Sequence, residues 1–324
     1  MIEFNINTQK NLLAFSAGID STALFFLLLE KNIPFDIAIV DYNLRAQSKD
    51  EVAYAKELAS KYDKKCFTKE IKLANTSNFE KHARDIRYEF FEDIIKNENY
   101  QSLITAHQLN DKLEWFLMQL TKGAGLVELI GLEDKTSKET YTIYRPLLEV
   151  SKDELQNFLE KNKLKYFIDS SNSDEKYKRN YFRKNFSNDL IKTYKNGIKN
   201  SFKYLESDIQ SLSLKGKPIY KKESLEIFTN QNDKNLNIKI IDKSLKKRGI
   251  LISKAQRDEI LKQKEISISD KINISITDKF IYIAPKSAHV MDKVFKESCR
   301  INKIPKNIRA YIFEIKIEPK DLFI

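Results

Sequence analysis

The chain has 324 residues, of which 41% are hydrophobic and 32% charged, and its formal net charge is +11 at pH 7. These values are typical of a globular protein of about two domains. No apolar run approaches the roughly 20 residues that span a bilayer, and the N-terminus lacks the pattern of a signal peptide, so we expect a cytoplasmic protein without a membrane partner. The two cysteines, Cys66 and Cys299, are far apart, which argues against a thiolate metal site or an iron–sulfur cluster.

The first half of the chain alternates short apolar runs with amphipathic segments. Strands are expected at 12–15, 35–40, 65–71, 102–106 and 141–144, and helices at 20–31, 49–62, 79–97 and 109–121. This alternation predicts a doubly wound, parallel α/β sheet. Because right-handed crossovers bring the carboxyl ends of parallel strands to one edge, Ser16, Asp41 and His107 should meet there.

The pattern changes after about residue 150. Ser151 and Glu154 form a capping box at the start of a predicted helix. The Asn- and Lys-rich piece 229–239 is expected to be a loop near a domain boundary, and a helix at 253–262 precedes alternating strands at 266–283. We therefore predict a catalytic domain at 1–185, a helical linker at 186–225 and a smaller, basic α+β domain at 226–324.

The sequence SAGIDS stands between the first expected strand and the first expected helix. The backbone N–H groups of such a turn, with the helix dipole behind them, can bind a phosphate, and the hydroxyls of Ser16 and Ser21 add donors. It is not a Walker loop, because no Gly-Lys-Ser/Thr follows. From spacing alone, a purely structural helix cap is an equally good explanation.

SAGIDS resembles the SGGxDS signature of the N-type ATP-pyrophosphatases, with Ala17 in place of the first glycine. That family cleaves ATP between its α and β phosphates and adenylates a carbonyl-type oxygen. The alanine implies a backbone φ at position 17 that is compatible with a Cβ. The resemblance implies that ATP binds a loop made of Ser16, Ala17, Gly18, Ile19, Asp20 and Ser21.

Further segments resemble the tRNA(Ile)-lysidine synthetase branch of that family. They are VDYNLR at 40–45, EKHARDIRY at 80–88, TAHQLNDKLE at 105–114, KGAGL at 122–126, RPLL at 145–148, DSSN at 169–172 and RNYFR at 179–183. Tyr42, Asn110 and Trp115 depart from the pattern, which usually has His, Asp and Thr there. Each motif alone is weak, but their order over 12–185 is specific.

The resemblance implies ATP, magnesium, free L-lysine and an isoleucine tRNA with a CAU anticodon as substrates and cofactors. In such enzymes the 2-oxygen of the wobble cytidine attacks the α-phosphate and pyrophosphate leaves; the amine of lysine then attacks the ring carbon and AMP leaves. Magnesium would be held by Asp20 or Asp111.

The second step needs a neutral amine, although only about one lysine side chain in a thousand is unprotonated at pH 7. His107, Asp111 and Glu114 lie at i, i+4 and i+7, and would share one face if the helix already includes His107. With Asp41, they are the candidate acid/base and ammonium-binding residues. For His107 alone, a structural role at a strand end is the alternative.

Arginine is rare in this chain, at ten of its 57 basic residues, so an arginine indicates a site that needs a planar, bidentate donor. We expect contacts with tRNA or with ATP phosphates from Arg45, Arg84, Arg87, Arg145, Arg179 and Arg183. Solvated helix faces would explain any one of them equally well. In the C-terminal domain, the candidate tRNA-binding cations are Lys246, Lys247, Arg248, Lys303 and Lys306.

Two alternatives stay open at this point, and so does the choice between a monomer and a homodimer. Another tRNA-modifying ATP-pyrophosphatase, such as a thiolase, would normally need paired cysteines. A catalytically inactive tRNA-binding relative would explain Ala17, Tyr42 and Asn110.

Overall fold

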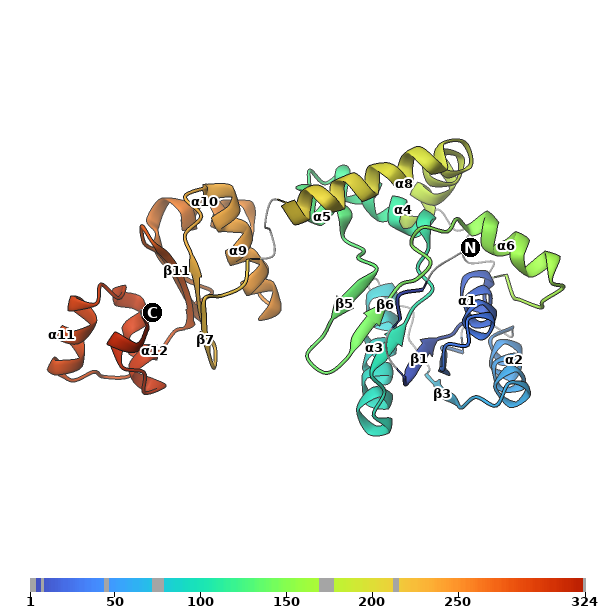
Figure 1. The fold of residues 1–324 in the computed structure, drawn as a ribbon, viewed down its shortest axis with the longest axis horizontal. Helices are drawn as coiled ribbons and strands as arrows, with labels where there is room; N and C mark the ends of the chain where they lie inside the picture. The colour runs from blue at the N-terminus through green and yellow to red at the C-terminus, as the bar shows by residue number, and fades with distance from the viewer. Residues whose placement is uncertain are drawn as a thin grey trace. The chain divides into compact units, whose positions relative to one another are not determined.

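The computed structural model describes residues 4–6, 9–43, 47–71, 79–168, 178–211 and 216–322. The chain divides into two compact units, Met1–Glu206 and Ser207–Ile324, and each is described here by itself (Figure 1). Within the described ranges, no helix combines the length and the apolar character needed to cross a membrane.

Unit 1 is built on a six-stranded sheet in the order β3-β2-β1-β4-β6-β5. The strands are β1 (Asn11–Ala14), β2 (Asp36–Asp41), β3 (Cys66–Glu70), β4 (Ser102–Ile104), β5 (Lys135–Ser137) and β6 (Thr142–Tyr144). All neighbours pair in parallel except β5, which runs antiparallel to β6 at the edge. The predicted doubly wound parallel sheet is therefore confirmed, and β5 is the strand that the sequence did not reveal.

The helices of unit 1 follow the predicted alternation closely. They are α1 (Ile19–Glu30), α2 (Gln47–Lys61), α3 (Phe79–Glu98), α4 (Leu109–Leu120), α5 (Leu126–Ile130), α6 (Lys152–Lys161), α7 (Lys178–Phe182), the π-helical turn η2 (Arg183–Ser187) and α8 (Asn188–Ser211). The capping box of Ser151 and Glu154 is confirmed, because each side chain accepts from the other's backbone N–H.

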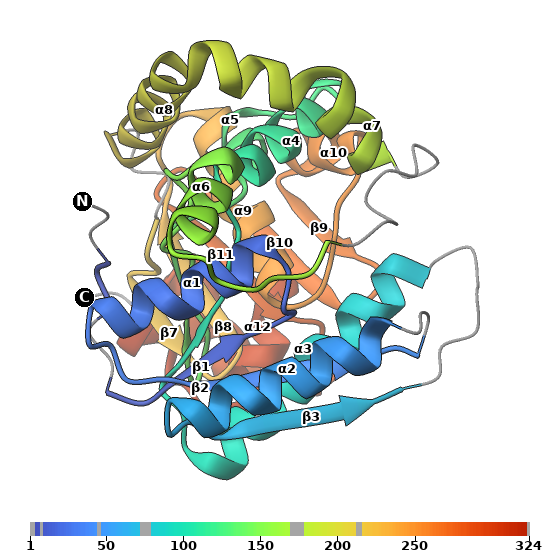
Figure 2. The ribbon, with the colours of Figure 1, turned by 90° about the vertical axis from the view of Figure 1, so that its right-hand side faces the viewer.

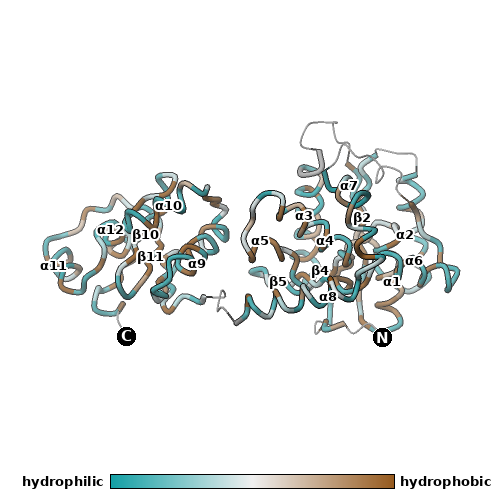
Figure 3. Tube along the Cα trace, turned by 90° about the horizontal axis from the view of Figure 1, so that it is seen from above, coloured by the Kyte–Doolittle hydropathy of each residue, from teal (hydrophilic) through white to brown (hydrophobic). Residues whose placement is uncertain are grey.

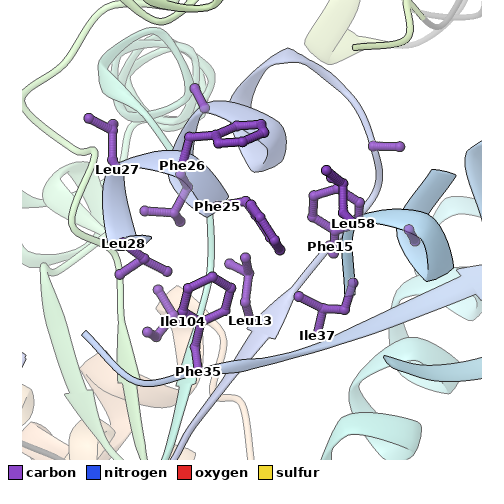
Figure 4. Close-up of a cluster of buried hydrophobic side chains, with 14 of the residues drawn as sticks. Leu13, Phe15, Phe25, Phe26, Leu27, Leu28, Phe35, Ile37, Leu58 and Ile104 are labelled. Carbon is purple, nitrogen blue, oxygen red and sulfur yellow. The ribbon is translucent and has the colours of Figure 1, made fainter. Parts of the chain in front are cut away.

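The alternation of side chains along each strand places helices on both faces of this sheet. Leu13, Ile37 and Ile104 point to the face that α1, α2 and α6 cover, where the aromatic rings of α1 fill the core (Figures 2 and 4). Leu12 and Leu103, one residue earlier, point to the opposite face, where they pack against α3. Because both faces are buried, the central strands β1, β2 and β4 consist mainly of apolar residues.

Unit 2 is a five-stranded antiparallel sheet in the order β7-β8-β11-β10-β9 with helices on both faces. Its elements are β7 (Tyr220–Lys222), β8 (Leu225–Thr229), α9 (Lys234–Lys247), α10 (Lys254–Gln263), β9 (Glu265–Ile268), β10 (Ile272–Ile276), β11 (Phe280–Pro285), α11 (Lys293–Ile301), α12 (Lys306–Glu314) and the 3-10 turn η3 (Pro319–Leu322). One hydrophobic cluster lies under α9 and α10, and the other lies under α11 and α12. Hydrophobic stretches of the chain lie inside each unit (Figure 3).

The interpretation of 229–239 as a loop is confirmed at 230–233 and wrong from Lys234 onward, where α9 begins. Asp233 caps this helix by accepting the N–H of Leu236 at 2.8 Å. The asparagines that suggested a loop have specific partners: Asn237 is buried and accepts the N–H of Gln231 at 3.0 Å. These polar side chains therefore form hydrogen bonds at the start of α9 and do not mark a linker.

Candidate active site

The C-terminal edge of the sheet in unit 1 contains the point where the strand order reverses. The chain passes from β1 to β2 on one side and returns to β4 on the other, and both are parallel neighbours of β1. Ser16, Asp41 and His107 stand at the carboxyl ends of these adjacent strands, so the structure places them at one edge. In sheets of this kind, ligands bind at such a reversal.

The loop after β1 is shaped by its two serines. The N–H of Ser16 donates to Oγ of Ser21 at 3.1 Å, and the two hydroxyl oxygens lie 3.0 Å apart. Gly18 caps α1 with extended backbone and no side-chain hydrogen bond, so the first amides of the helix are available to an anion. On the other side, the N–H of Phe167 donates to the carbonyl of Ala17 at 2.9 Å and fastens the loop to the chain after α6.

The backbone at Ala17 accommodates a Cβ, but at an unfavourable φ. Its φ is 58°, in the left-handed region that glycine adopts without cost and that costs other residues roughly 1–2 kcal/mol. Its methyl group is fully buried in the core under α1, which offsets part of that cost. The loop thus keeps the geometry that a glycine would give, although a Cβ is present.

Behind the loop lies a cluster of carboxylates and guanidinium groups. Glu114 has no exposed surface, and it accepts from Nε of Arg183 at 2.7 Å and from Nε of Arg179 at 2.9 Å. Oδ1 of Asp111 accepts from Arg179 at 2.7 Å, and its Oδ2 caps α4 by accepting the N–H of Gln108 at 3.0 Å. Burial alone would raise the pKa of Asp111, but Arg179 and the other positive groups hold it below the usual value.

These contacts join the elements that carry the predicted site residues. Asp111 and Glu114 lie on α4, whereas Arg179 and Arg183 lie on α7 and η2, which pack against it (Figure 2). In this structure the carboxylates of Asp111 and Glu114 are therefore paired with the predicted arginines. The predicted site residues come together, but they bind mainly one another, whereas the sequence predicted contacts with substrates.

Asp20 is the carboxyl group of this region that has a free oxygen. Its buried Oδ1 has no hydrogen-bond partner among the described residues. Burial, followed by the charges of Asp111 and Glu114, raises the pKa of Asp20 to about 7, while Lys152 and Arg183 oppose this shift. The group is thus in place to take up a proton or a cation. The described residues include no cluster of three or more side chains able to hold a metal by themselves.

His107 lies outside the helix, because α4 begins at Leu109 and Gln108 is its N-cap. The condition for a shared helical face with Asp111 and Glu114 is therefore not met. The imidazole is nonetheless close enough to Asp111 for their charges to interact, and Nδ1 lies 3.0 Å from the hydroxyl of Thr105. Burial, with Arg145 and other cations, lowers the pKa of His107 to about 4, so the ring is neutral at pH 7.

The remaining predicted residues are distributed around this edge. Arg145 holds the start of β5, donating to the carbonyl of Glu133 at 2.7 Å, and Arg84 is exposed over the ring of Tyr88. Oδ1 of Asp41 accepts the N–H of Asn43 at 2.8 Å. The predicted Arg45 and the DSSN segment lie outside the described residues. A separate hollow at the far end of α1 is lined by Phe4, Asn5, Ile6, Lys31 and Ile33 and contains no predicted site residue.

Three residues that depart from the motif pattern have packing roles. Asn110 accepts the N–H of Lys152 at 3.1 Å and donates to Oδ1 of Asn188 at 3.2 Å, which an aspartate could not do. The Tyr42 hydroxyl donates to a carbonyl of α3 at 3.0 Å. The indole of Trp115 covers Gly131, where an added Cβ would lie 1.9 Å from the ring. No motif in the sequence indicated that Lys152 and Asn188 border the site.

The parallel sheet, with the SAGIDS turn at the point of strand reversal, has the architecture of a nucleotide-binding α/β domain. Residues 2–190 match the family described as the PP-loop domain.

Relatives define the branch of this class. The chain is 44% identical, over 97% of its own length and 95% of the other, to the tRNA(Ile)-lysidine synthase of Campylobacter jejuni strain RM1221. It is 42% identical to the synthase of Wolinella succinogenes, over 98% and 96% of the two chains. The chain therefore belongs to the tRNA(Ile)-lysidine synthase family. Among solved structures, it is similar to the U34-tRNA thiolase NcsA from Methanococcus maripaludis, with 20% identity, a TM-score of 0.48, and coverage of 63% of this chain and 73% of that one.

Proposed function

We propose that this protein uses ATP to join free lysine to C2 of the wobble cytidine in an isoleucine tRNA with a CAU anticodon, through an adenylated cytidine. The observation that carries the proposal is the similarity to tRNA(Ile)-lysidine synthases over nearly the whole of both chains. The position of the SAGIDS loop beside the acidic cluster supports it. We place this activity in the cytoplasm, together with tRNA and free lysine.

In the first step the protein must hold the triphosphate while the cytidine oxygen attacks the α-phosphorus and pyrophosphate leaves. The loop from Ser16 to Ser21 offers backbone N–H groups and two hydroxyls to the phosphates. Arg84, Arg87 and Arg145 are the proposed further contacts to ATP or tRNA phosphates. Their guanidinium groups would stabilise the charge that develops on the leaving group.

Magnesium fits the donor set at this edge. The ion is bound in proteins through one or two carboxylates together with substrate phosphates and water, and Asp20 presents a buried oxygen without a partner. Asp111 is less available, because both of its oxygens already accept hydrogen bonds. When bound, the ion would neutralise phosphate charge. We therefore propose Asp20 as its protein ligand.

In the second step an ammonium group must be bound and must then lose a proton. Asp111 and Glu114 supply the negative charge, and the half-exposed Arg179 can yield a carboxylate oxygen to the substrate. His107 is neutral at pH 7, so its ring nitrogen has a lone pair for the proton; the neighbouring Asp111 favours the protonated ring, whereas burial and Arg145 oppose it. Asp41, at the end of the neighbouring strand β2, is the remaining candidate acid/base or ammonium-binding residue. We propose that these residues together bind and deprotonate lysine.

Replacing His107 by alanine should slow the attack of lysine more than the formation of the adenylate. Loss of a general base typically lowers a rate by about 100-fold or more, whereas the phosphate loop is untouched. Single-turnover assays would follow adenylated tRNA and lysine-bearing tRNA separately. A His107→Gln variant controls for the loss of volume. Equal losses in the two steps would argue against the role of a base.

Unit 2 carries nearly all of the net charge, which supports its proposed role in tRNA binding. Residues 207–324 contain 25 Lys and Arg against 15 Asp and Glu, whereas residues 1–206 contain 32 against 31. A region with a net charge of +10 attracts an RNA backbone regardless of sequence. Arg248 is less suited to that role than predicted, because its guanidinium binds the buried Glu226 at 3.1 Å, and Lys246 pairs with Asp242 at 2.7 Å.

The paired substitution Lys303→Gln and Lys306→Gln should weaken tRNA binding and make it less sensitive to salt. If both side chains contact phosphates, the slope of log affinity against log salt concentration should become shallower by about 1 to 2. Filter binding with an isoleucine tRNA over a salt series measures this. The matched control replaces Lys61 and Lys64 in unit 1. An unchanged slope in the unit 2 variant would exclude these two lysines from the interface.

The test of the function mixes purified protein, ATP, magnesium, labelled lysine and an isoleucine tRNA transcript with an unmodified CAU anticodon. Label should enter the tRNA, and AMP and pyrophosphate should form in equal amounts. A transcript with uridine at the wobble position should remain unlabelled. If pyrophosphate forms with the CAU transcript without any uptake of lysine, the proposed nucleophile, lysine, is wrong. If neither occurs, the proposal fails.

A further inference from the structure

Two aromatic rings stand exposed on the segment that carries the arginines of the acidic cluster. Tyr181 and Phe186 are 44% and 42% exposed, and their ring centroids lie 5.9 Å apart. Phe182 is buried beneath them, 5.9 Å from Tyr181 and 5.6 Å from Phe186. Phe182 already fills the core at this place, so the fold does not need the two outer rings. Exposed apolar groups that gather in this way indicate a binding surface.

The π-helical turn brings the two rings together. Residues five apart on an α-helix point about 140° away from each other. η2, at Arg183–Ser187, widens the helix by one residue per turn and returns Phe186 to the side of Tyr181. The same segment directs Arg179 and Arg183 to Glu114. The aromatic pair is thereby fixed within three residues of side chains of the candidate active site, and π turns are frequent at functional sites.

The charge around Tyr181 and Phe186 indicates which class of ligand the two rings bind. The segment 178–188 contains no carboxylate, and it adds Lys178 and Lys184 to Arg179 and Arg183, whose guanidinium groups already pair with Glu114 and Asp111. Exposed aromatic rings among cations match a single-stranded nucleic acid, which offers base faces for stacking and phosphates for the cations. The apolar face of a protein partner would gain nothing from these cations.

We propose that Tyr181 and Phe186 form a stacking platform for an unpaired base next to the wobble cytidine in the anticodon loop. Stacking of that neighbour would hold the loop so that the cytidine reaches the ATP. The chemistry suits an anticodon loop, whose bases can be unstacked without opening a duplex. This inference rests on the proposed function for the identity of the RNA, and it adds the residues that position it.

Tyr181→Ala and Phe186→Ala should each raise the Kd for the CAU transcript by about 10-fold at fixed salt, because a stacked base contributes on the order of 1–3 kcal/mol. The KM for ATP should stay unchanged. Tyr204→Ala is the matched control, since Tyr204 is 71% exposed on α8 and should be silent. Tyr181→Phe should keep wild-type affinity, whereas Tyr181→Leu should not. Wild-type affinity in Tyr181→Leu would indicate that the ring acts only by apolar packing, and it would overturn the proposal.

Transcripts that lack one base locate the contact. One transcript lacks the base 5′ of the wobble cytidine, and a second lacks the base 3′ of it. If Tyr181 stacks on one of these bases, Tyr181→Ala should not weaken the affinity for the transcript that lacks that base. An equal loss on both transcripts would overturn the proposal. So would a change in self-association, measured by sedimentation, without a change in tRNA affinity, because the platform would then belong to an interface between two copies of this chain.

The outcomes separate this proposal from the ligation itself. If wild-type protein binds the transcript through Tyr181 but never incorporates lysine, the stacking is upheld and the proposed reaction is refuted. If lysine is incorporated and the alanine variants bind tRNA as tightly as wild type, the reaction is upheld and the platform is refuted.

Discussion

The variant Glu114→Ala should lose about 3 kcal/mol of unfolding free energy. Glu114 is fully buried and bonds to both Arg179 and Arg183, so its removal leaves two guanidinium groups with Asp111 as their remaining carboxylate. Breaking a buried ion pair from one side typically costs about 3–5 kcal/mol, and we take the low end because Arg179 is 44% exposed.

The single tryptophan of the chain makes this measurement specific. Trp115 lies on α4 beside Glu114, so its fluorescence during urea unfolding reports on unit 1. The control Glu98→Ala breaks an exposed pair with Lys65 and should cost at most about 1 kcal/mol. A loss below 1 kcal/mol in Glu114→Ala would show that the arginines find water or other partners without cost.

The variant Asp20→Ala should release pyrophosphate at least about 100-fold more slowly than wild type, with no loss of stability. The buried carboxyl has an unpartnered oxygen and lies near two other carboxylates, so its removal relieves an unfavourable arrangement. Asp50→Ala is the matched control, because Asp50 also stands in the first turn of a helix but is exposed. Full turnover by Asp20→Ala would refute the assignment of the loop.

The stability of Asp20→Asn relative to wild type should depend on pH. The pKa of Asp20 is about 7 in the folded protein and 3.8 for the ordinary group, so between these values the folded state holds a proton that the unfolded state has lost. The contribution of Asp20 to the unfolding free energy of the wild type is therefore fully present below about pH 4, and it is lost as the pH rises through about 7. Asparagine cannot titrate, so its advantage should grow over this range. A constant difference would mean that Asp20 is not buried as described.

The sequence was sufficient for the five parallel strands of unit 1, because buried strands are short apolar runs such as Leu12–Phe15 and the helices between them, such as 49–62, show the helical period. It failed at β5, whose residues Lys135–Ser137 are polar and pair at an edge. It failed again at α9, where asparagine suggested a loop. In both places, tertiary partners decided the conformation and the local pattern did not.

The candidate site shows the same limit. The strand ends predicted that Ser16, Asp41 and His107 would meet at one edge. The sequence could not show that Asp111 and Glu114 bind Arg179 and Arg183, because that pairing joins residues more than 60 positions apart. Likewise, the left-handed φ of Ala17 is a property of the closed loop, and no propensity of alanine reveals it.

The uneven charge of the two units has a kinetic consequence. Long-range attraction scales with net charge, so we expect the search for tRNA to depend more on the basic unit 2 than on unit 1, which is nearly neutral. Ionic strength should then govern how quickly the RNA arrives and leave the rate of the bound complex almost untouched. On this expectation, substitutions in unit 2 would change the capture of tRNA and leave the chemistry in unit 1 unaltered.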